Sequence, residues 1–91
     1  MKNHYVYIAR CQDEALYIGK TTNLENRIMV HNNGQGAQFV RQHGPAKIVY
    51  FEKFYNDLDA CKRERQIKKW SRIKKENLIK YKHPNPKKLN I

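Results

Sequence analysis

The sequence has few cysteines, no long apolar run and no signal peptide pattern. Its two cysteines, Cys11 and Cys61, fit no metal-binding spacing, and we expect both to be reduced core residues with no disulfide partner. No apolar run approaches the length of about 20 residues that a membrane-spanning helix needs, so no membrane partner is expected. The first residues meet a charge at Arg10 before any long apolar segment, which predicts a cytoplasmic protein without a signal peptide.

Acidic residues are also scarce, with 8 Asp and Glu against 19 Lys and Arg, and the net charge is +11. The excess lies in residues 62–91, which contain 12 basic and 2 acidic residues, whereas residues 1–61 contain 7 and 6. A charge so concentrated favours a nucleic-acid partner over an anionic membrane or a merely solvated surface. The cations expected to bind nucleic acid are Arg63, Arg65, Lys68, Lys69, Arg72, Lys74 and Lys75.

A chain of 91 residues with a 40% hydrophobic share has the size and composition of one folded domain with one modest core. We place this domain at residues 1–82. Residues 83–91 contain two prolines and few apolar side chains, which predicts an extended basic tail. The oligomeric state is left open.

The pattern of the first half predicts a β-hairpin followed by a helix. Two short apolar and aromatic runs, 5–9 and 16–19, are separated by turn-forming polar residues. Thr22 and Glu25 have the spacing of a capping box, so a helix should begin near Asn23. A short helical segment is expected over residues 37–43.

The second half predicts one strand and two helices. Residues 47–55, KIVYFEKFY, are apolar on both alternations, which is typical of a central strand covered on both faces. Asn56 and Asp57 should cap a helix running toward Trp70, with its apolar side formed by Leu58, Cys61 and Ile67. Ser71 should open a further short helix. The fold class is α/β, in the order β-β-α-α-β-α-α, with a small antiparallel or mixed sheet flanked by helices.

Glu64 is the most informative single residue. Its spacing from Cys61 and Ile67 places a carboxylate beside the apolar stripe of the predicted helix. A carboxylate in that position must be paired, protonated or bound to a metal ion. Spacing alone slightly favours an ion pair with a nearby cation such as Lys68.

The motifs Tyr5-Val6-Tyr7 and Tyr17-Ile18-Gly19, followed by Lys20, Arg27 and His31, resemble the GIY-YIG nuclease superfamily. The later segment 60–64, ending in Glu64, is similar to the family's glutamate-bearing helix. The likeness is greatest to the small, stand-alone, single-domain branch. It implies a three-stranded antiparallel sheet, an endonuclease that hydrolyses phosphodiester bonds, and one divalent cation, Mg²⁺ or Mn²⁺, on Glu64. A single carboxylate with waters and substrate phosphates suits Mg²⁺.

The resemblance also gives roles to residues that, taken alone, would be interpreted as structural. Tyr7, helped by Lys20 or His31, would remove a proton from the attacking water, and Tyr17 would orient the phosphate. Arg27 would stabilise the developing negative charge. Without the resemblance, the tyrosines are ordinary half-buried strand residues, and Arg27 with His31 is a solvated pair one helical turn apart.

The shared site makes a geometric demand on the hairpin. Side chains alternate along a strand, so a two-residue loop would place Tyr7 and Tyr17 on opposite faces of the sheet. We therefore predict an odd-length connection or a β-bulge, which would place both rings on one face.

Three functions compete at this point. We expect a metal-dependent endonuclease with structure-selective or weakly specific cleavage, acting on DNA rather than RNA, for example in DNA repair. The alternative is a non-catalytic nucleic-acid-binding module that keeps the nuclease fold. A remoter interpretation is a subunit of a larger repair or restriction complex.

Overall fold

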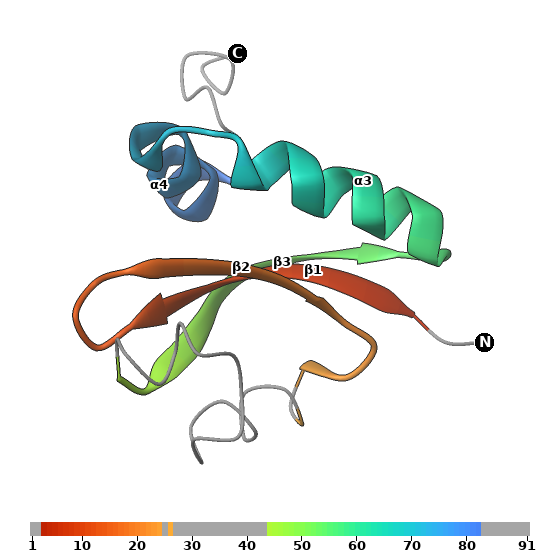
Figure 1. The fold of residues 1–91 in the computed structure, drawn as a ribbon, viewed down its shortest axis with the longest axis horizontal. Coiled ribbons are helices and arrows are strands. Elements are labelled where there is room, and N and C mark those ends of the chain that lie inside the picture. Colours follow the sequence, from red (N-terminus) through yellow and green to blue (C-terminus); the bar gives the residue numbers. More distant parts are fainter. Residues whose placement is uncertain (1–2, 25, 27–43, 83–91) are drawn as a thin grey trace.

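The computed structural model describes residues 3–24, 26 and 44–82. Within them a three-stranded antiparallel sheet has the strand order β2-β1-β3, with β1 spanning His4–Cys11, β2 Leu16–Thr21 and β3 Ala46–Phe54. Two helices, α3 (Asp57–Lys68) and α4 (Arg72–Tyr81), follow β3 and lie over one face of the sheet (Figure 1). The expected α/β fold with a small antiparallel sheet is confirmed. Within these residues, no helix is long and apolar enough to cross a membrane.

The hairpin loop has the odd length that was predicted. Cys11 donates its backbone N–H to Ala15 at 2.8 Å, which leaves a loop of Gln12, Asp13 and Glu14. Glu14 adopts a left-handed conformation with φ of 73°, the usual end of a three-residue hairpin loop. The register pairs Tyr7 with Gly19 and Ala9 with Tyr17, so the two tyrosines share a face.

The prediction that β3 is the central strand is wrong. β1 occupies the centre, and four consecutive residues of it, 6–9, are buried, whereas β3 forms an edge. The register of β3 against β1 shifts by one residue between Ile8 and Ala9, where a β-bulge interrupts the pairing. A bulge changes which side chains face which layer, so a run that is apolar on both alternations does not require two covered faces.

The face of the sheet under the helices forms the main apolar core. Val6 and Ile8 of β1 pack there with Ile18 of β2 and with side chains from both helices, namely Ala60, Ile67 and Leu78. Asn56 caps α3 by accepting a hydrogen bond from the backbone N–H of Asp59, and Ser71 caps α4 in the same way from Lys74. Leu58, expected in the core, is 63% exposed because the buried stripe of α3 consists of Ala60 and Ile67.

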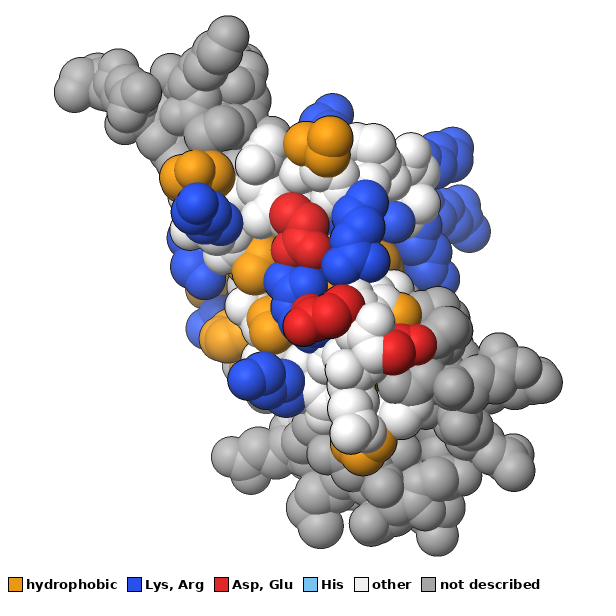
Figure 2. Space-filling view, turned by 90° about the vertical axis from the view of Figure 1, so that its left-hand side faces the viewer, with side chains coloured by type: hydrophobic (Ala, Val, Ile, Leu, Met, Phe, Trp, Pro, Cys, Tyr) orange, Lys and Arg blue, Asp and Glu red, His pale blue; other side chains and the backbone are white. Residues whose placement is uncertain are grey.

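An ion-pair network holds α4 against the hairpin. Arg10 donates two hydrogen bonds to Glu76, at 2.6 and 2.9 Å, and Arg72 donates to Glu76 at 3.1 Å and to the backbone oxygen of Glu14 at 2.6 Å. Figure 2 views this end of the molecule and shows acidic side chains next to lysine or arginine side chains near the centre of the face. The positive charge of Arg10 lowers the pKa of Glu76, and the carboxylate in turn raises the pKa of Arg10.

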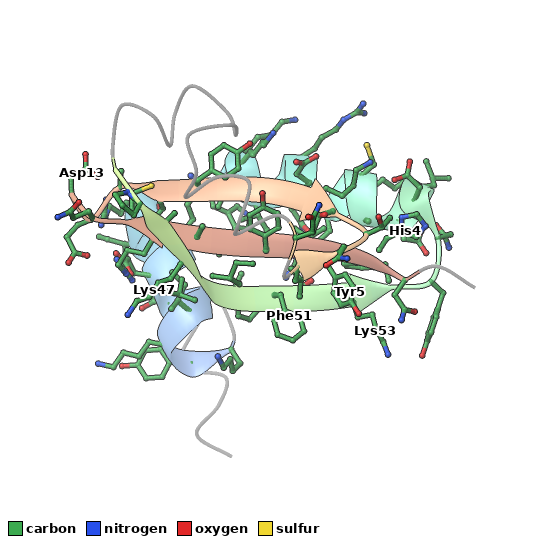
Figure 3. All side chains as sticks on the ribbon, turned by 90° about the horizontal axis from the view of Figure 1, so that it is seen from below. His4, Tyr5, Asp13, Lys47, Phe51 and Lys53 are labelled. Carbon is green, nitrogen blue, oxygen red and sulfur yellow. The ribbon has the colours of Figure 1, made fainter. Side chains whose placement is uncertain are left out.

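The opposite face of the sheet contains a second, smaller cluster. Tyr7, Ala9, Cys11 and Ala46 are buried there, with Tyr17, Leu24 and Ile48 packed around them. Figure 3 views the sheet from this side, with α3 and α4 behind it. Cys11 is buried and Cys61 is half-buried, and both are free thiols.

Candidate active site

Tyr7 and Tyr17 form an aromatic pair on the face of the sheet that is turned away from α3. Their ring centroids are 6.2 Å apart and the planes are tilted by 38°. Tyr7 is 1% exposed, and Tyr17 is half-buried beside it. The central strand and the hairpin register therefore bring together two of the predicted site residues.

Gly19 determines where the Tyr7 phenol lies. A Cβ atom built on Gly19 would overlap the hydroxyl oxygen and ring carbons of Tyr7. The ring of Tyr7 therefore lies directly over its cross-strand partner, with the hydroxyl above β2. Glycine is required here for close approach, and the glycine of the Tyr17-Ile18-Gly19 motif thereby directs the phenol toward the β2 edge of the sheet.

Lys20, the residue after this glycine, lies on the other face of β2. Its ammonium donates a hydrogen bond of 2.6 Å to Asp57, in the first turn of α3. This bond, with the negative charges of Asp57 and Glu64 nearby, raises the pKa of Lys20. Asp57 also lies 3.7 Å from His4, and its own pKa is lowered, chiefly by the bond from Lys20. Lys20 is therefore a fixed cation near neutral pH and is poorly suited to accept a proton.

Glu64 lies on α3 close enough to Lys20 to contribute to its electrostatics. Its side chain is 17% exposed and lies 3.4 Å from Lys68, the ion pair expected from spacing alone. Lys68 is about half exposed, so this pairing is open to solvent on the lysine side. An ion pair between residues four apart on a helix contributes roughly 0.3–0.5 kcal/mol, which a bound cation can readily replace.

The two groups of candidate residues lie on opposite faces of the sheet, at or beside the edge strand β2. Tyr7 and Tyr17 lie on one face of the sheet, and Lys20 lies with α3 on the other. β2 is an edge strand, so a single strand separates the groups. Neighbouring strands are about 4.8 Å apart, so a phosphate group at this edge can approach side chains from both faces.

Comparison with known proteins identifies the family. The family model described as the GIY-YIG catalytic domain matches residues 3–77. The chain belongs to the GIY-YIG family. The matched range includes both strands of the hairpin and the α3 glutamate, so this is a nuclease domain by family.

Several relatives of similar size align along most of their length. A UPF0213 protein of Clostridium perfringens is 55% identical over 84% of this chain and 82% of its own. One of Oceanobacillus iheyensis is 44% identical over 88% and 93%. The NMR structure of a UPF0213 protein of Bacillus halodurans superposes with a TM-score of 0.58 at 41% identity, over 88% of this chain and 85% of that chain. A second NMR structure, of an E. faecalis protein, gives 0.62 at 38%, over 93% and 91%.

GIY-YIG nucleases generally use divalent metal ions, and the donor set of this chain fits one kind of site. In residues 3–24, 26 and 44–82, His, Cys, Asp and Glu side chains form no cluster of three or more that could hold an ion. Glu64 stands as a single carboxylate beside an open edge. Mg²⁺ usually keeps several waters and takes one or two carboxylates with substrate phosphates, so this set fits Mg²⁺ better than a tightly caged ion.

Some of the cations predicted to bind nucleic acid contact other side chains of the fold. Arg63 donates two hydrogen bonds to Glu52, at 2.9 and 3.0 Å, and its guanidinium lies 5.1 Å from the centroid of the Trp70 ring. The Lys74 ammonium also lies over the Trp70 ring, 4.6 Å from its centroid. Arg72 donates a hydrogen bond to Glu76. Arg65 on α3 and Lys69 at the C-cap of that helix are exposed, and Lys75 on α4 is half-buried. The structure thus gives Arg63 and Arg72 roles in holding the helices in place.

Two predicted residues, Arg27 and His31, lie outside the described part of the chain, as do the predicted helix over 37–43 and the tail over 83–91. Leu24 and Asn26, at the predicted start of the first helix, are helical. The side-chain oxygen of Asn23, rather than that of the predicted Thr22, accepts a hydrogen bond from the backbone N–H of Asn26 at 3.0 Å.

Sequence reasoning missed Asp57 as a residue of the site. It was interpreted only as part of the cap of α3, a task that Asn56 performs. Asp57 instead fixes Lys20, from which it is separated by 37 residues along the chain. An acidic residue in a first helical turn is common, and nothing local in the sequence indicates such a distant partner.

Proposed function

We propose that this protein is a divalent-metal-dependent endonuclease that hydrolyses phosphodiester bonds, with DNA preferred over RNA. The observation that supports it is the arrangement around β2 in a GIY-YIG chain: a tyrosine pair on one face, and Lys20 with Glu64 on the other. A non-catalytic binding module would have no use for a carboxylate beside a surface that must accept a polyanion.

In this mechanism the residues of the chain divide the work between binding and proton transfer. Glu64 would hold the divalent ion, which would supply Lewis-acid stabilisation of the phosphate and of the leaving 3′ oxygen. Tyr17 orients the phosphate, and the Tyr7 hydroxyl takes a proton from the attacking water. A phenol has a reference pKa of about 10, so it needs a nearby cation to act as a base near neutral pH.

The cations of the site supply that charge. Lys20, held by Asp57, stays protonated and lowers the cost of forming a phenolate at the β2 edge. Arg27 stabilises the negative charge that develops on the phosphoryl oxygens, and His31 relays the proton. These last two roles rest on the family resemblance.

The test is a cleavage assay of the purified protein on duplex, flap, single-stranded DNA and single-stranded RNA substrates. Each substrate is incubated with Mg²⁺, Mn²⁺ or EDTA. We expect cutting of at least one DNA substrate with Mg²⁺ or Mn²⁺ and none in EDTA. Tight binding of all substrates without cleavage under any condition would favour the binding module instead.

A further inference from the structure

Large aromatic side chains lie exposed along the β3 edge of the sheet. Phe51 is 53% exposed and Tyr55, just beyond the end of β3, is 76% exposed. Together with Tyr5 and Lys53 they form a group that we name the aromatic strip (Tyr5, Phe51, Lys53 and Tyr55). Figure 3 shows Tyr5, Phe51 and Lys53 close together along β3. Burial in the core does not account for these rings.

The members of the aromatic strip contact one another. The Tyr5 and Phe51 rings meet edge to face, with centroids 5.9 Å apart and planes at 72°. The Lys53 ammonium lies 5.7 Å from the centroid of the Tyr55 ring. A shallow depression lined by Tyr5, Thr22, Asn23 and Leu24 extends the strip toward the end of β2.

The strip lies on the same face of the sheet as the tyrosine pair. The register places Phe51 directly opposite Tyr7, and Lys53 directly opposite Tyr5. Gly19 is the other neighbour of Tyr7, so Gly19, Tyr7 and Phe51 follow one another across the sheet. Phe51 therefore lies about 10 Å from Gly19 across the sheet, the width of two strand spacings.

The charge on the strip favours an anionic occupant. No carboxylate in the described part of the chain lies within ion-pair distance of Lys53. Glu52, its neighbour, is held by Arg63 of α3 on the opposite face. A second copy of this chain is a poor candidate, because each copy has a net charge of +11 and the two strips would bring like charges together.

We propose that the aromatic strip binds unpaired nucleobases of the substrate strand by stacking, next to the site of cleavage. The inference deepens the proposed nuclease function and rests on it. Exposed aromatic rings interleaved with cations are the usual means of holding single strands, since every base has a π-face. Bases inside a duplex are already stacked on each other, so a strip of this kind favours single strands, flaps and ends.

The test compares binding of two 15-mers in EDTA: oligo-dT and an abasic strand with the same phosphates. We expect the parent to bind oligo-dT well above the abasic strand. Phe51→Leu and Tyr55→Leu, which keep an apolar side chain, should each weaken oligo-dT binding about tenfold and leave abasic binding within about twofold. The matched control is Ile73→Ala, which removes an apolar side chain that is 74% exposed on α4. An oligo-U arm separates DNA from RNA.

Equal binding of the two strands by the parent would overturn the proposal, as would unchanged oligo-dT binding by both leucine variants. A parent dimer in sedimentation that Phe51→Leu converts to a monomer, with unchanged DNA binding, would assign the strip to a second copy instead. Tyr55→Leu keeps the test decisive if Phe51→Leu does not fold, since Tyr55 lies outside β3. Cleavage is scored separately, so absence of cutting by the parent counts against the nuclease function and leaves the stacking result readable.

Discussion

The two faces of the sheet are built from the same strands but have different chemistry. Under the helices, Val6 and Ile8 of β1 pack with buried aliphatic side chains, and Tyr50 and Trp70 lie partly buried around them. On the other face, Tyr7 brings a hydroxyl over Gly19, with Tyr17 beside it. Side chains alternate along the central strand β1, so Val6 and Ile8 stabilise the core under the helices, whereas Tyr7 lies on the face that carries the candidate catalytic residues. Substitutions on each face should separate the two roles.

The largest effect is expected at Glu64. Glu64→Gln keeps the size of the side chain and removes its charge, so Mg²⁺-dependent cleavage should fall by several orders of magnitude. The lost partner is the exposed Lys68, and such a pair contributes only about 0.3–0.5 kcal/mol, so the melting temperature should change little. Binding in EDTA should persist or tighten, because a charge that repels phosphate is gone.

Glu76→Gln is the matched control for Glu64→Gln, since it removes a carboxylate from the other helix. It should lower the melting temperature and leave cleavage per folded molecule unchanged. If Glu64→Gln instead behaved as this control does, Glu64 would be a structural ion-pair partner and the catalytic assignment would be lost.

The second-largest effect is expected at Tyr7, and it is compared with Ile8, the neighbouring residue of β1 that faces the opposite side of the sheet. Tyr7→Phe should lower the cleavage rate roughly 10²–10⁴-fold if the hydroxyl acts as the general base. Ile8→Val, at a fully buried position, should cost about 0.5–1.5 kcal/mol of stability and leave the rate per folded molecule unchanged. Cleavage and urea denaturation are measured on both. Parental cutting by Tyr7→Phe would exclude Tyr7 as the base.

Gly19→Ala probes the same phenol from the neighbouring strand. The added methyl would overlap the Tyr7 ring, which is almost fully buried and has little room to move. Overpacking of this kind costs about 1–3 kcal/mol, and displacement of the hydroxyl should slow cleavage at temperatures where the variant is folded. Gly44→Ala is the control: its φ of 87° strains an alanine at a position that contacts Gln12 and no tyrosine. It should lose stability with no change in the cleavage rate.

Local patterns in the sequence predicted the elements well, and failures came where distant parts meet. The hairpin and the helix caps at Asn56 and Ser71 depend on neighbouring residues. The odd loop was predicted instead from the family resemblance, which requires both tyrosines on one face of the sheet. The edge position of β3 depends on a register shift against β1, which no local pattern contains.

Ion pairs across the fold could not be predicted for a similar reason. Lys20 with Asp57, and Arg10 with Glu76, join residues that are 37 and 66 positions apart. With 19 basic side chains available, spacing alone cannot select the partner of a given carboxylate. For the candidate site, the residue types could be identified from the sequence and their proposed roles came from the family resemblance, whereas their placement on the two faces of the sheet beside β2 required the folded chain.

The smallest effect is expected in the pH dependence of stability and concerns Glu76. Its pKa is lowered from the ordinary value of 4.5 by the bonds from Arg10 and Arg72. A carboxyl group whose folded pKa is depressed stabilises the fold above its unfolded pKa, and the contribution disappears as the pH falls through the folded pKa. The side chain is 34% exposed, so we expect only about 1 kcal/mol after solvent screening.

Urea denaturation of the parent and Glu76→Gln from pH 7 to pH 3 measures this contribution. The variant should be less stable at pH 7, and the difference should shrink as the pH falls below about 4.5, where the parent carboxylate takes up its proton. Glu14→Gln is the matched control, because Glu14 lies 3.5 Å from the same Arg10 but is 70% exposed. It should follow the parent curve at every pH. A constant difference between Glu76→Gln and the parent across this range would show that the charge of Glu76 contributes nothing, and that the helix face is held to the hairpin by packing alone.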